Sequence, residues 1–314
     1  MNIRHVAVVG TGMMGPGIAA IFALAGRQAT LVSRSAEGAS RGVATANGLI
    51  AQLLANALAD PGQAGDARAL LAASTDPEAA ARAAQLVVES IPEDLALKQA
   101  FFARLARAAP DAIRCSNTSG LSITAIAAKV ARPERILTAH FWNPPHLMPL
   151  VEVVMGERTD PAIAGEVVDV LRACGKVPVL VRKDRPGQLG NRMQHAMIRE
   201  CVHIVQEGIA TPEDVDLAVK TGVGLRFPAY GVFEHADLVG LDLVKAVQDY
   251  VVRDLSTTQG AGHLHAEKVA RGDLGAKTGQ GFLDWTPEKA EAVRAHRDAF
   301  LMQFLRWEKG RGTT

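Results

Sequence analysis

The chain begins with a short apolar strand, a glycine-rich turn and an apolar helix in immediate succession, within residues 6–25. In such a unit the first glycine permits a tight turn, the second lets the backbone approach a pyrophosphate, and the third lets the helix pack close to the strand. The N–H groups and dipole of the helix N-terminus then face the phosphates. The segment therefore predicts a dinucleotide-binding α/β domain with a doubly wound sheet. The residues expected to contact the cofactor in this turn are Gly10, Gly12, Met13, Met14 and Gly15.

The residues after the second apolar strand, 29–32, bear on the choice between NAD and NADP. NAD sites of this kind place an Asp or Glu there to accept a hydrogen bond from the ribose 2′-hydroxyl, whereas this chain has Ser33 and Arg34. A serine and an arginine suit a 2′-phosphate, which a carboxylate would repel. We therefore expect NAD(P) as the cofactor, with NADP mildly favoured. The alternative is that Arg34 stacks on the adenine and NAD is accepted.

Strand and helix patterns alternate through the first half of the chain and give way to helices in the second. Further buried strands are expected at 86–90, 113–116, 136–141 and 178–181. After a charged turn with proline and glycine at 183–187, helical periodicity dominates over 188–206, 212–221, 238–255 and 287–307. The sequence thus predicts an α/β protein, with a Rossmann-type doubly wound sheet domain at 1–184 followed by an all-α C-terminal domain at 185–314.

A histidine and a carboxylate flank a proline turn near the middle of the chain. His140 ends a predicted strand, and Glu152 follows a second apolar run beyond Pro144 and Pro145. A histidine can take a proton from an alcohol and return it to a carbonyl, and a nearby carboxylate fixes its tautomer. On local sequence alone, a packed and hydrogen-bonded histidine is the more common outcome. The pair is therefore a candidate acid/base dyad that needs support from the rest of the chain.

A polar turn, residues 117–120, follows the expected strand at 113–116. Ligands of such folds bind at the carboxyl edge of the parallel sheet, so Ser119 is a candidate site residue. On local sequence alone the alternative, an ordinary turn or helix-cap serine, is favoured.

The charge balance argues against a nucleic-acid or membrane partner. The net charge is +1, and no block of lysines and arginines is present. No signal peptide is visible, and the longest apolar runs are too short to span a bilayer. Three widely spaced cysteines make neither a disulfide framework nor a metal site. We expect a cytoplasmic protein that binds a small molecule and no metal.

Taken in order, these segments resemble the short-chain L-3-hydroxyacyl-CoA dehydrogenase family over nearly the whole chain. Several independent motifs in the same order are hard to explain by chance. Beyond the glycine turn, the motifs that carry the resemblance are Glu93 and Lys98 after a Val-Val-Glu strand, Ser-Asn-Thr-Ser at 116–119, His-Phe-Trp-Asn-Pro from 140, Leu-Val-Glu-Val at 150–153, Pro-Gly-Gln-Leu-Gly-Asn-Arg at 186–192 and Lys-Thr-Gly-Gln-Gly-Phe at 277–282.

The resemblance implies a reversible, NAD(P)-dependent oxidation of a secondary hydroxyl to the ketone by hydride transfer, in a 3-hydroxy acid or a 3-hydroxyacyl thioester. By this resemblance His140 is the general acid/base and Glu152 its orienting partner. Ser119 and Asn191 hydrogen-bond the substrate oxygen or position the dyad. The other contacts carried over are Glu93, Lys98 and Asn117 for the cofactor and Asn143 for the substrate. Glu93 and Lys98 alternatively form an ordinary surface pair. The family also implies a homodimer whose helical domain closes the substrate cleft.

Two departures from the family pattern concern the substrate. Residues 36–59 contain one basic residue, Arg41, where relatives acting on CoA thioesters are expected to carry lysines and serines for the CoA phosphates. The segment 225–234 is more similar to relatives that oxidise small hydroxy acids, such as the gulonate, carnitine and pyridine-carboxylate dehydrogenases. Its Arg226 suits a substrate carboxylate, and a surface or interdomain arginine is an equal alternative.

The choice among a CoA thioester, a free hydroxy acid and an aldehyde-bearing carboxylate thus stays open at this point. Outside enzymes, the alternative is a non-catalytic, crystallin-like dinucleotide-binding protein. The four intact residues of the expected catalytic set argue against it: Ser119, His140, Glu152 and Asn191.

Overall fold

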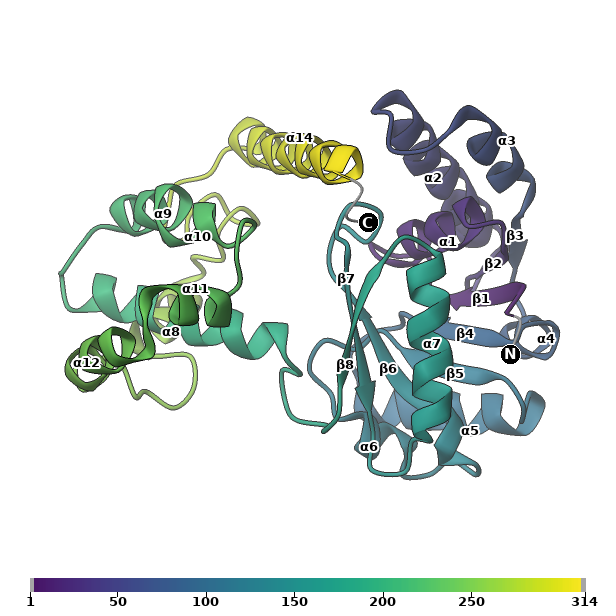
Figure 1. The fold of residues 1–314 in the computed structure, drawn as a ribbon. Helices are drawn as coiled ribbons and strands as arrows, with labels where there is room; N and C mark the ends of the chain where they lie inside the picture. Colours follow the sequence, from purple (N-terminus) through teal and green to yellow (C-terminus); the bar gives the residue numbers. More distant parts are fainter. Residues whose placement is uncertain (1–2, 312–314) are drawn as a thin grey trace. The chain divides into compact units, whose positions relative to one another are not determined.

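The structure, a computed structural model, describes residues 3–311, which form two compact units. The first unit is the described part of Met1–Arg192 together with that of Arg297–Thr314, and the second unit is Met193–His296. The first unit contains the β-sheet with its helices, and the second is helical (Figure 1).

The described residues of the first unit form one sheet of eight strands. In spatial order the strands are β3 (Leu71–Ser74), β2 (Gln28–Val32), β1 (His5–Val9), β4 (Leu86–Glu89), β5 (Ile113–Ser116), β6 (Ile136–Phe141), β7 (Leu150–Met155) and β8 (Val177–Val181). All neighbouring strands are parallel except β6 and β7. The order 3-2-1-4-5-6 of the first six strands is that of the Rossmann fold, which confirms the predicted fold class.

Different sets of helices cover the two faces of the sheet (Figure 1). Successive strand residues point to opposite faces, so Val6 and Val8 belong to one apolar core and Ala7 and Val9 to the other. The core that contains Val8 is packed by α1 (Gly15–Leu24), α2 (Ala36–Ala55), α3 (Pro61–Ala69) and α7 (Pro161–Ala173). The other core is packed by α4 (Pro77–Ala83), α5 (Leu95–Ala108) and α6 (Ile123–Ala127). A single 3₁₀ turn, η1 (Pro133–Arg135), precedes β6.

The second unit is helical and has little core of its own. The helices of this part of the chain are α8 (Gly190–Gln206), α9 (Pro212–Thr221), α10 (Val223–Arg226), α11 (Val232–Val239), α12 (Leu241–Val251), α13 (His263–Arg271) and α14 (Pro287–Arg311). Within Met193–His296, all of which the structure describes, only Ser256 and Ala290 are buried. The single helix expected over 238–255 is wrong, because Gly240 with φ +104° separates α11 from α12. Across residues 3–311, no helix combines the length and apolar content needed to cross a membrane.

The division expected after residue 184 differs from the compact units in two respects. Asp184 accepts hydrogen bonds from Ser122 Oγ at 2.5 Å and from Thr124 N at 2.9 Å, so the chain stays with the first unit and leaves it only after Arg192. The end of α14 also belongs to the first unit, where its apolar residues pack around Leu53 and Leu147. Both differences arise from long-range contacts that a change of local pattern does not reveal.

Candidate active site

The glycine turn between β1 and α1 leaves open space at one position. A Cβ at Gly10 would lie 2.5 Å from the carbonyl oxygen of Ser90, and one at Gly15 would lie 1.8 Å from that of Gly10. The protein's own packing therefore requires both glycines. A Cβ at Gly12 would meet no atom within 4 Å, so the small size of this residue serves something other than packing. No side chain caps the N-terminus of α1, and Met13 is 78% exposed. The turn fits a dinucleotide pyrophosphate.

The end of β2 presents a fixed hydroxyl and an exposed guanidinium. Thr11 Oγ1 donates a hydrogen bond to Ser33 Oγ at 3.1 Å, which ties Ser33 to the glycine turn. Arg34 is exposed beside it. The nearest carboxylate in the following helix, Glu37, forms an ion pair with Arg41. The residues at this corner thus offer donors and a positive charge rather than the carboxylate common in NAD sites.

His140 and Glu152 face each other across the antiparallel pair of strands β6 and β7. Their backbones are directly opposite in the register, which places both side chains on the same face of the sheet. Nδ1 of His140 lies 2.7 Å from Oε2 of Glu152, and His140 is only 5% exposed. Because an ionised carboxylate only accepts, Nδ1 carries the proton and Nε2 remains available as a base. The expected dyad is therefore formed as a buried pair.

Glu152 accepts four hydrogen bonds and has no exposed surface. Besides His140, Trp142 Nε1 donates to Oε2 at 3.0 Å, and the backbone N–H groups of Leu189 and Gly190 donate to Oε1 at 2.8 Å each. Burial acts to raise the pKa of Glu152, but these hydrogen bonds outweigh it and lower the pKa to about 2. Glu152 is therefore a carboxylate at all physiological pH values, and it holds the Nδ1 proton of His140 and the orientation of the ring.

Ser119 and Asn191 are brought together with the dyad by one short segment, residues 188–191. Nδ2 of Asn191 donates to the backbone carbonyl of Ser119 at 3.1 Å, and Gln188 Nε2 donates to that of Thr118 at 2.8 Å. The two residues between them supply the N–H groups that bind Glu152. The same segment thus holds the serine turn and the dyad, while Ser119 itself is exposed.

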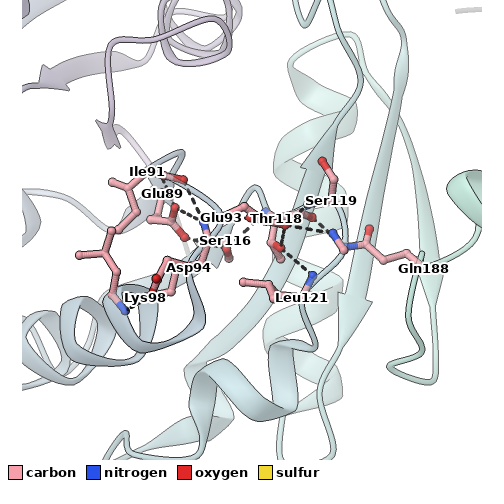
Figure 2. Close-up of polar contacts among 12 residues, drawn as sticks. Glu89, Ile91, Glu93, Asp94, Lys98, Ser116, Thr118, Ser119, Leu121 and Gln188 are labelled. Atoms are coloured by element: carbon pink, nitrogen blue, oxygen red, sulfur yellow. Dashed lines mark hydrogen bonds and ion pairs between the residues drawn. The ribbon is translucent and has the colours of Figure 1, made fainter. Parts of the chain in front are cut away.

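Glu93 organises the serine turn from the other side (Figure 2). Its Oε1 accepts hydrogen bonds from Thr118 Oγ1 and from the backbone N–H groups of Ser119 at 3.0 Å and Gly120 at 3.1 Å. Burial acts to raise the pKa of the Glu93 carboxyl, but these hydrogen bonds and the Lys98 ammonium group outweigh it and hold the pKa below its ordinary value. Glu93 therefore fixes the loop that presents Ser119.

The alternative that Glu93 and Lys98 form an ordinary surface pair is wrong. Lys98 is 1% exposed, and its Nζ donates to Oε1 of the fully buried Glu89 at 2.5 Å, with Oε2 of Glu93 at 3.5 Å (Figure 2). Glu89 also accepts from Ser116 Oγ at 2.7 Å. A surface pair contributes little to stability, whereas breaking a buried pair leaves an uncompensated charge.

Lys98→Met is expected to lower the free energy of unfolding by about 3 kcal/mol, because Glu89 would remain buried without its cation. Adding Glu89→Gln should recover much of the loss, so the two changes will not be additive. Urea unfolding of both single variants and the double variant measures this, with the exposed Lys129→Met as a control. A loss in Lys98→Met no larger than in Lys129→Met would contradict the role of the buried pair.

The remaining expected site residues are not hydrogen-bond partners of Glu93 or Glu152. Oδ1 of Asn117 accepts from the backbone N–H of Phe141 at 2.8 Å and so ties the end of β5 to the end of β6. Asn143 is exposed in the loop between β6 and β7. Arg226 ends α10 in the second unit and is exposed.

Several contributors were not identified from the sequence. Glu89 offered a signal, since an acidic residue at the end of an apolar strand run is unusual. Gln188 and Trp142 lay inside recognised motifs without an assigned role. Gly190 gave no signal, although a Cβ there would lie 2.3 Å from the Trp142 ring. The small size of Gly190 therefore lets Trp142 reach Glu152.

A Rossmann sheet, a glycine turn at its first helix and a histidine–carboxylate pair on two adjacent strands are the arrangement of a dinucleotide-dependent oxidoreductase. Residues 5–185 match the family model of the 3-hydroxyacyl-CoA dehydrogenase NAD binding domain, and residues 187–285 match that of the 3-hydroxyacyl-CoA dehydrogenase C-terminal domain. The chain therefore belongs to the 3-hydroxyacyl-CoA dehydrogenase family of NAD-dependent oxidoreductases, and the resemblance read from its motifs is confirmed.

Similar proteins cover the chain from end to end or nearly so. The chain is 34% identical to the 5-formyl-3-hydroxy-2-methylpyridine 4-carboxylate 5-dehydrogenase of Mesorhizobium japonicum, over 98% of this chain and 99% of that protein. A solved structure of a 5-dehydrogenase acting on that acid, described as an NAD+ dependent dismutase, has a TM-score of 0.91 at 34% identity, covering 98% of this chain and 99% of the other. The (S)-3-hydroxybutyryl-CoA dehydrogenase of Ralstonia eutropha has a TM-score of 0.76 at 33% identity, covering 91% of this chain and 100% of the other.

Proposed function

We propose that the protein reversibly oxidises a secondary hydroxyl group to the ketone with a nicotinamide dinucleotide, using His140 as general acid/base. The buried pair of His140 and Glu152 on the adjacent strands β6 and β7 carries this proposal. Glu152 accepts the Nδ1 proton of His140, so Nε2 takes the hydroxyl proton of the substrate. The nicotinamide cofactor, when bound, supplies the hydride acceptor. Donors from Ser119 and Asn191 stabilise the charge that develops on the substrate oxygen.

The other site residues take supporting roles in this proposal. Asn143 contacts the substrate, and Arg226 pairs with a substrate carboxylate. Glu93, whose side chain is 43% exposed, contacts the cofactor, and the buried Lys98 acts on the cofactor through Glu93. The remaining proposed cofactor contacts are Gly10, Gly12, Met13, Met14, Gly15, Ser33, Arg34 and Asn117.

Within this reaction class we favour a small free carboxylic acid over a CoA thioester as substrate. The one basic residue in α2, Arg41, is already paired with Glu37, so α2 offers no free charge to CoA phosphates. The full-length similarity to a pyridine-carboxylate dehydrogenase supports the same choice, since its TM-score of 0.91 exceeds the 0.76 of the hydroxybutyryl-CoA enzyme. An aldehyde-bearing carboxylate belongs to the same substrate class.

The test is optical assay of NADPH and NADH consumption with free 3-oxo carboxylates and, separately, with acetoacetyl-CoA. Turnover of free acids with little turnover of the thioester is the expected result. Turnover of the thioester alone would contradict the substrate choice while leaving the reaction class intact. No turnover of either, in protein that binds the dinucleotide, would argue for the non-catalytic alternative.

For the cofactor we propose that NADP is favoured over NAD. Arg34 is exposed at the end of β2, and Ser33 is fixed by Thr11, so a 2′-phosphate would find an opposite charge and a hydroxyl donor. The similarity to an NAD+ dependent relative favours NAD instead. The ratio of the two dissociation constants decides between them.

Ser33→Asp combined with Arg34→Ala is expected to weaken NADPH binding by about tenfold or more and to tighten NADH binding, because a carboxylate repels the 2′-phosphate and accepts from the ribose hydroxyl. Titration of dinucleotide fluorescence measures both dissociation constants without turnover. The matched control is Arg41→Ala, one helical turn and more into α2. An unchanged ratio of the dissociation constants for NADPH and NADH would refute the assignment of the ribose site.

We further propose a homodimer formed through the second unit. Large apolar side chains of this unit are exposed, including Phe233 at 85%, Tyr250 at 83% and Leu238 at 79%. Because so few of its residues are buried, the unit needs contact with another protein surface to be stable. A second copy of the chain would bury these side chains symmetrically. Sedimentation equilibrium measures the mass, and a monomer at micromolar concentration would contradict the proposal.

A further inference from the structure

The loop between β6 and β7, residues 142–149, joins the strand that carries His140 to the strand that carries Glu152. Its first residue, Trp142, binds Glu152 through Nε1, and its ring centroid lies 5.8 Å from that of His140. Its second residue, Asn143, is a proposed substrate contact. The shape of this β6–β7 loop therefore decides where two side chains of the site stand.

Two carbonyl groups of the β6–β7 loop are bound by one buried ammonium group. Nζ of Lys176 donates to the carbonyl oxygens of Pro145 at 2.6 Å and Met148 at 2.9 Å. Lys176 is 6% exposed and lies immediately before β8. The loop's own amides are committed elsewhere, since Leu147 N and Met148 N both donate to Pro144. A buried carbonyl without a donor is unfavourable, so the loop depends on Lys176 for its shape.

The surroundings of Lys176 do not provide an ion pair. In residues 3–311, no carboxylate lies within salt-bridge distance of its ammonium group. Burial lowers the pKa of Lys176 to about 7, and the neighbouring Cys174 thiol acts in the opposite direction. Burying a lysine in such a place without a counter-charge costs free energy, which points to a specific task for its hydrogen bonds.

Other contacts hold the β6–β7 loop from the opposite side. A Cβ at Gly17 would lie 2.6 Å from Cγ of Pro145, so the loop sits directly on α1. Leu147 packs with Leu53 of α2 in an apolar cluster. The loop is thus fixed against α1 by packing, and against α2 by packing and by the contact of His146 Nε2 with Gln52 Oε1 at 3.2 Å. From the side of β8, Lys176 binds two of its carbonyl groups and Val177 N donates to the carbonyl of Pro149.

We propose that Lys176 is a positioning residue for the reaction, whose ammonium group holds the β6–β7 loop so that Trp142 and Asn143 stand correctly beside the His140–Glu152 pair. This rests on the proposed function of that pair. Lys176 touches neither substrate nor cofactor in this proposal and acts through the loop. Its removal therefore changes turnover and leaves dinucleotide binding intact.

The experiment compares Lys176→Met, Lys176→Ala and the exposed Lys183→Met as a control. Lys176→Met is expected to lower kcat by about tenfold to hundredfold, with an unchanged dissociation constant for the dinucleotide and unchanged kinetics in Lys183→Met. Ethylammonium should restore much of the kcat of Lys176→Ala by occupying the space left by the side chain, and should not restore that of Lys176→Met. Unchanged kcat in Lys176→Met, or a loss in Lys176→Ala that ethylammonium does not reverse, would overturn the proposal.

A readout independent of turnover separates this proposal from the proposed function. The chain has three tryptophans, so replacing Trp285 and Trp307 with Phe leaves Trp142 as the sole reporter of the loop. Lys176→Met in that background should increase acrylamide quenching of Trp142, and unchanged quenching would overturn the loop role even in an inactive protein. If Lys176→Met does not fold, Lys176→Gln replaces it. Because the Gln amide keeps an N–H donor, its increase in quenching and its loss of kcat should be smaller than those expected of Lys176→Met. Unchanged quenching and kcat in Lys176→Gln would count against the proposal.

Discussion

His140→Gln is expected to lower turnover by about 10³-fold while leaving dinucleotide binding nearly unchanged. Glutamine is close to histidine in size, and its amide N–H can still donate to Glu152. It cannot carry the hydroxyl proton of the substrate, because an amide does not titrate near neutrality. The loss should therefore appear in kcat for both oxidation and reduction, measured optically at saturating dinucleotide.

The control for this variant is His296→Gln, at an exposed histidine of the second unit. Its kinetics should match those of the wild type. The dissociation constant for the dinucleotide is measured in both variants by fluorescence titration, so that a loss of cofactor binding is not mistaken for a loss of proton transfer. A His140→Gln variant that turns over at the wild-type rate would remove the histidine from the mechanism.

The elements that were predictable from the sequence have local signals. The apolar run at β1, the glycine turn and the apolar start of α1 follow one another directly, so their order alone indicates a dinucleotide fold. By contrast, β3 has only four residues, none of them buried, and two are alanines that favour helix. The seven-residue α4 and five-residue α6 are too short to show a periodicity. These three elements were missed because their formation depends on the sheet they join.

The contacts of the candidate site were only partly predictable because they join distant parts of the chain. His140 and Glu152 are recognisable as residue types, but the pairing of β6 with β7 is what brings them together. The N–H groups of Leu189 and Gly190 that bind Glu152 carry no side-chain signal at all. Lys98 was expected as a cofactor contact or as half of a surface pair, and its burial follows only once Glu89 is known to point into the same space.

One polar network links the buried pair of Lys98 and Glu89 to the dyad. Lys98 bridges Glu89 and Glu93, and Glu93 holds the turn that carries Ser119. Residues 188–191 bind that turn on one side and Glu152 on the other. Most groups of this network are buried, so a substitution at one end affects the other end through the hydrogen bonds between them. The effects of two substitutions in the network on stability and activity should therefore be coupled rather than additive.

Glu152→Gln is expected to impair both activity and stability. The glutamine side chain has only one acceptor oxygen. If that oxygen accepts from the N–H groups of Leu189 and Gly190, the NH₂ group faces Trp142 and His140. His140 Nδ1 must then accept, which places the ring proton on Nε2 and removes the base. We expect kcat to fall by about 10³- to 10⁴-fold. Unmet buried donors should lower the free energy of unfolding by about 3 kcal/mol at pH 7.

The stability difference between wild type and Glu152→Gln should depend on pH with a defined sign. The folded pKa of Glu152, about 2, lies below its ordinary value of 4.5. The contribution of the ionised Glu152 carboxylate to the free energy of unfolding is therefore fully present above pH 4.5. It is lost as the pH falls toward 2, by about 3 kcal/mol in all. Urea unfolding at pH 7 and pH 3 measures this, with the exposed Glu157→Gln as control. A difference from wild type that stays constant between the two pH values would show that the ionised carboxylate of Glu152 does not stabilise the fold.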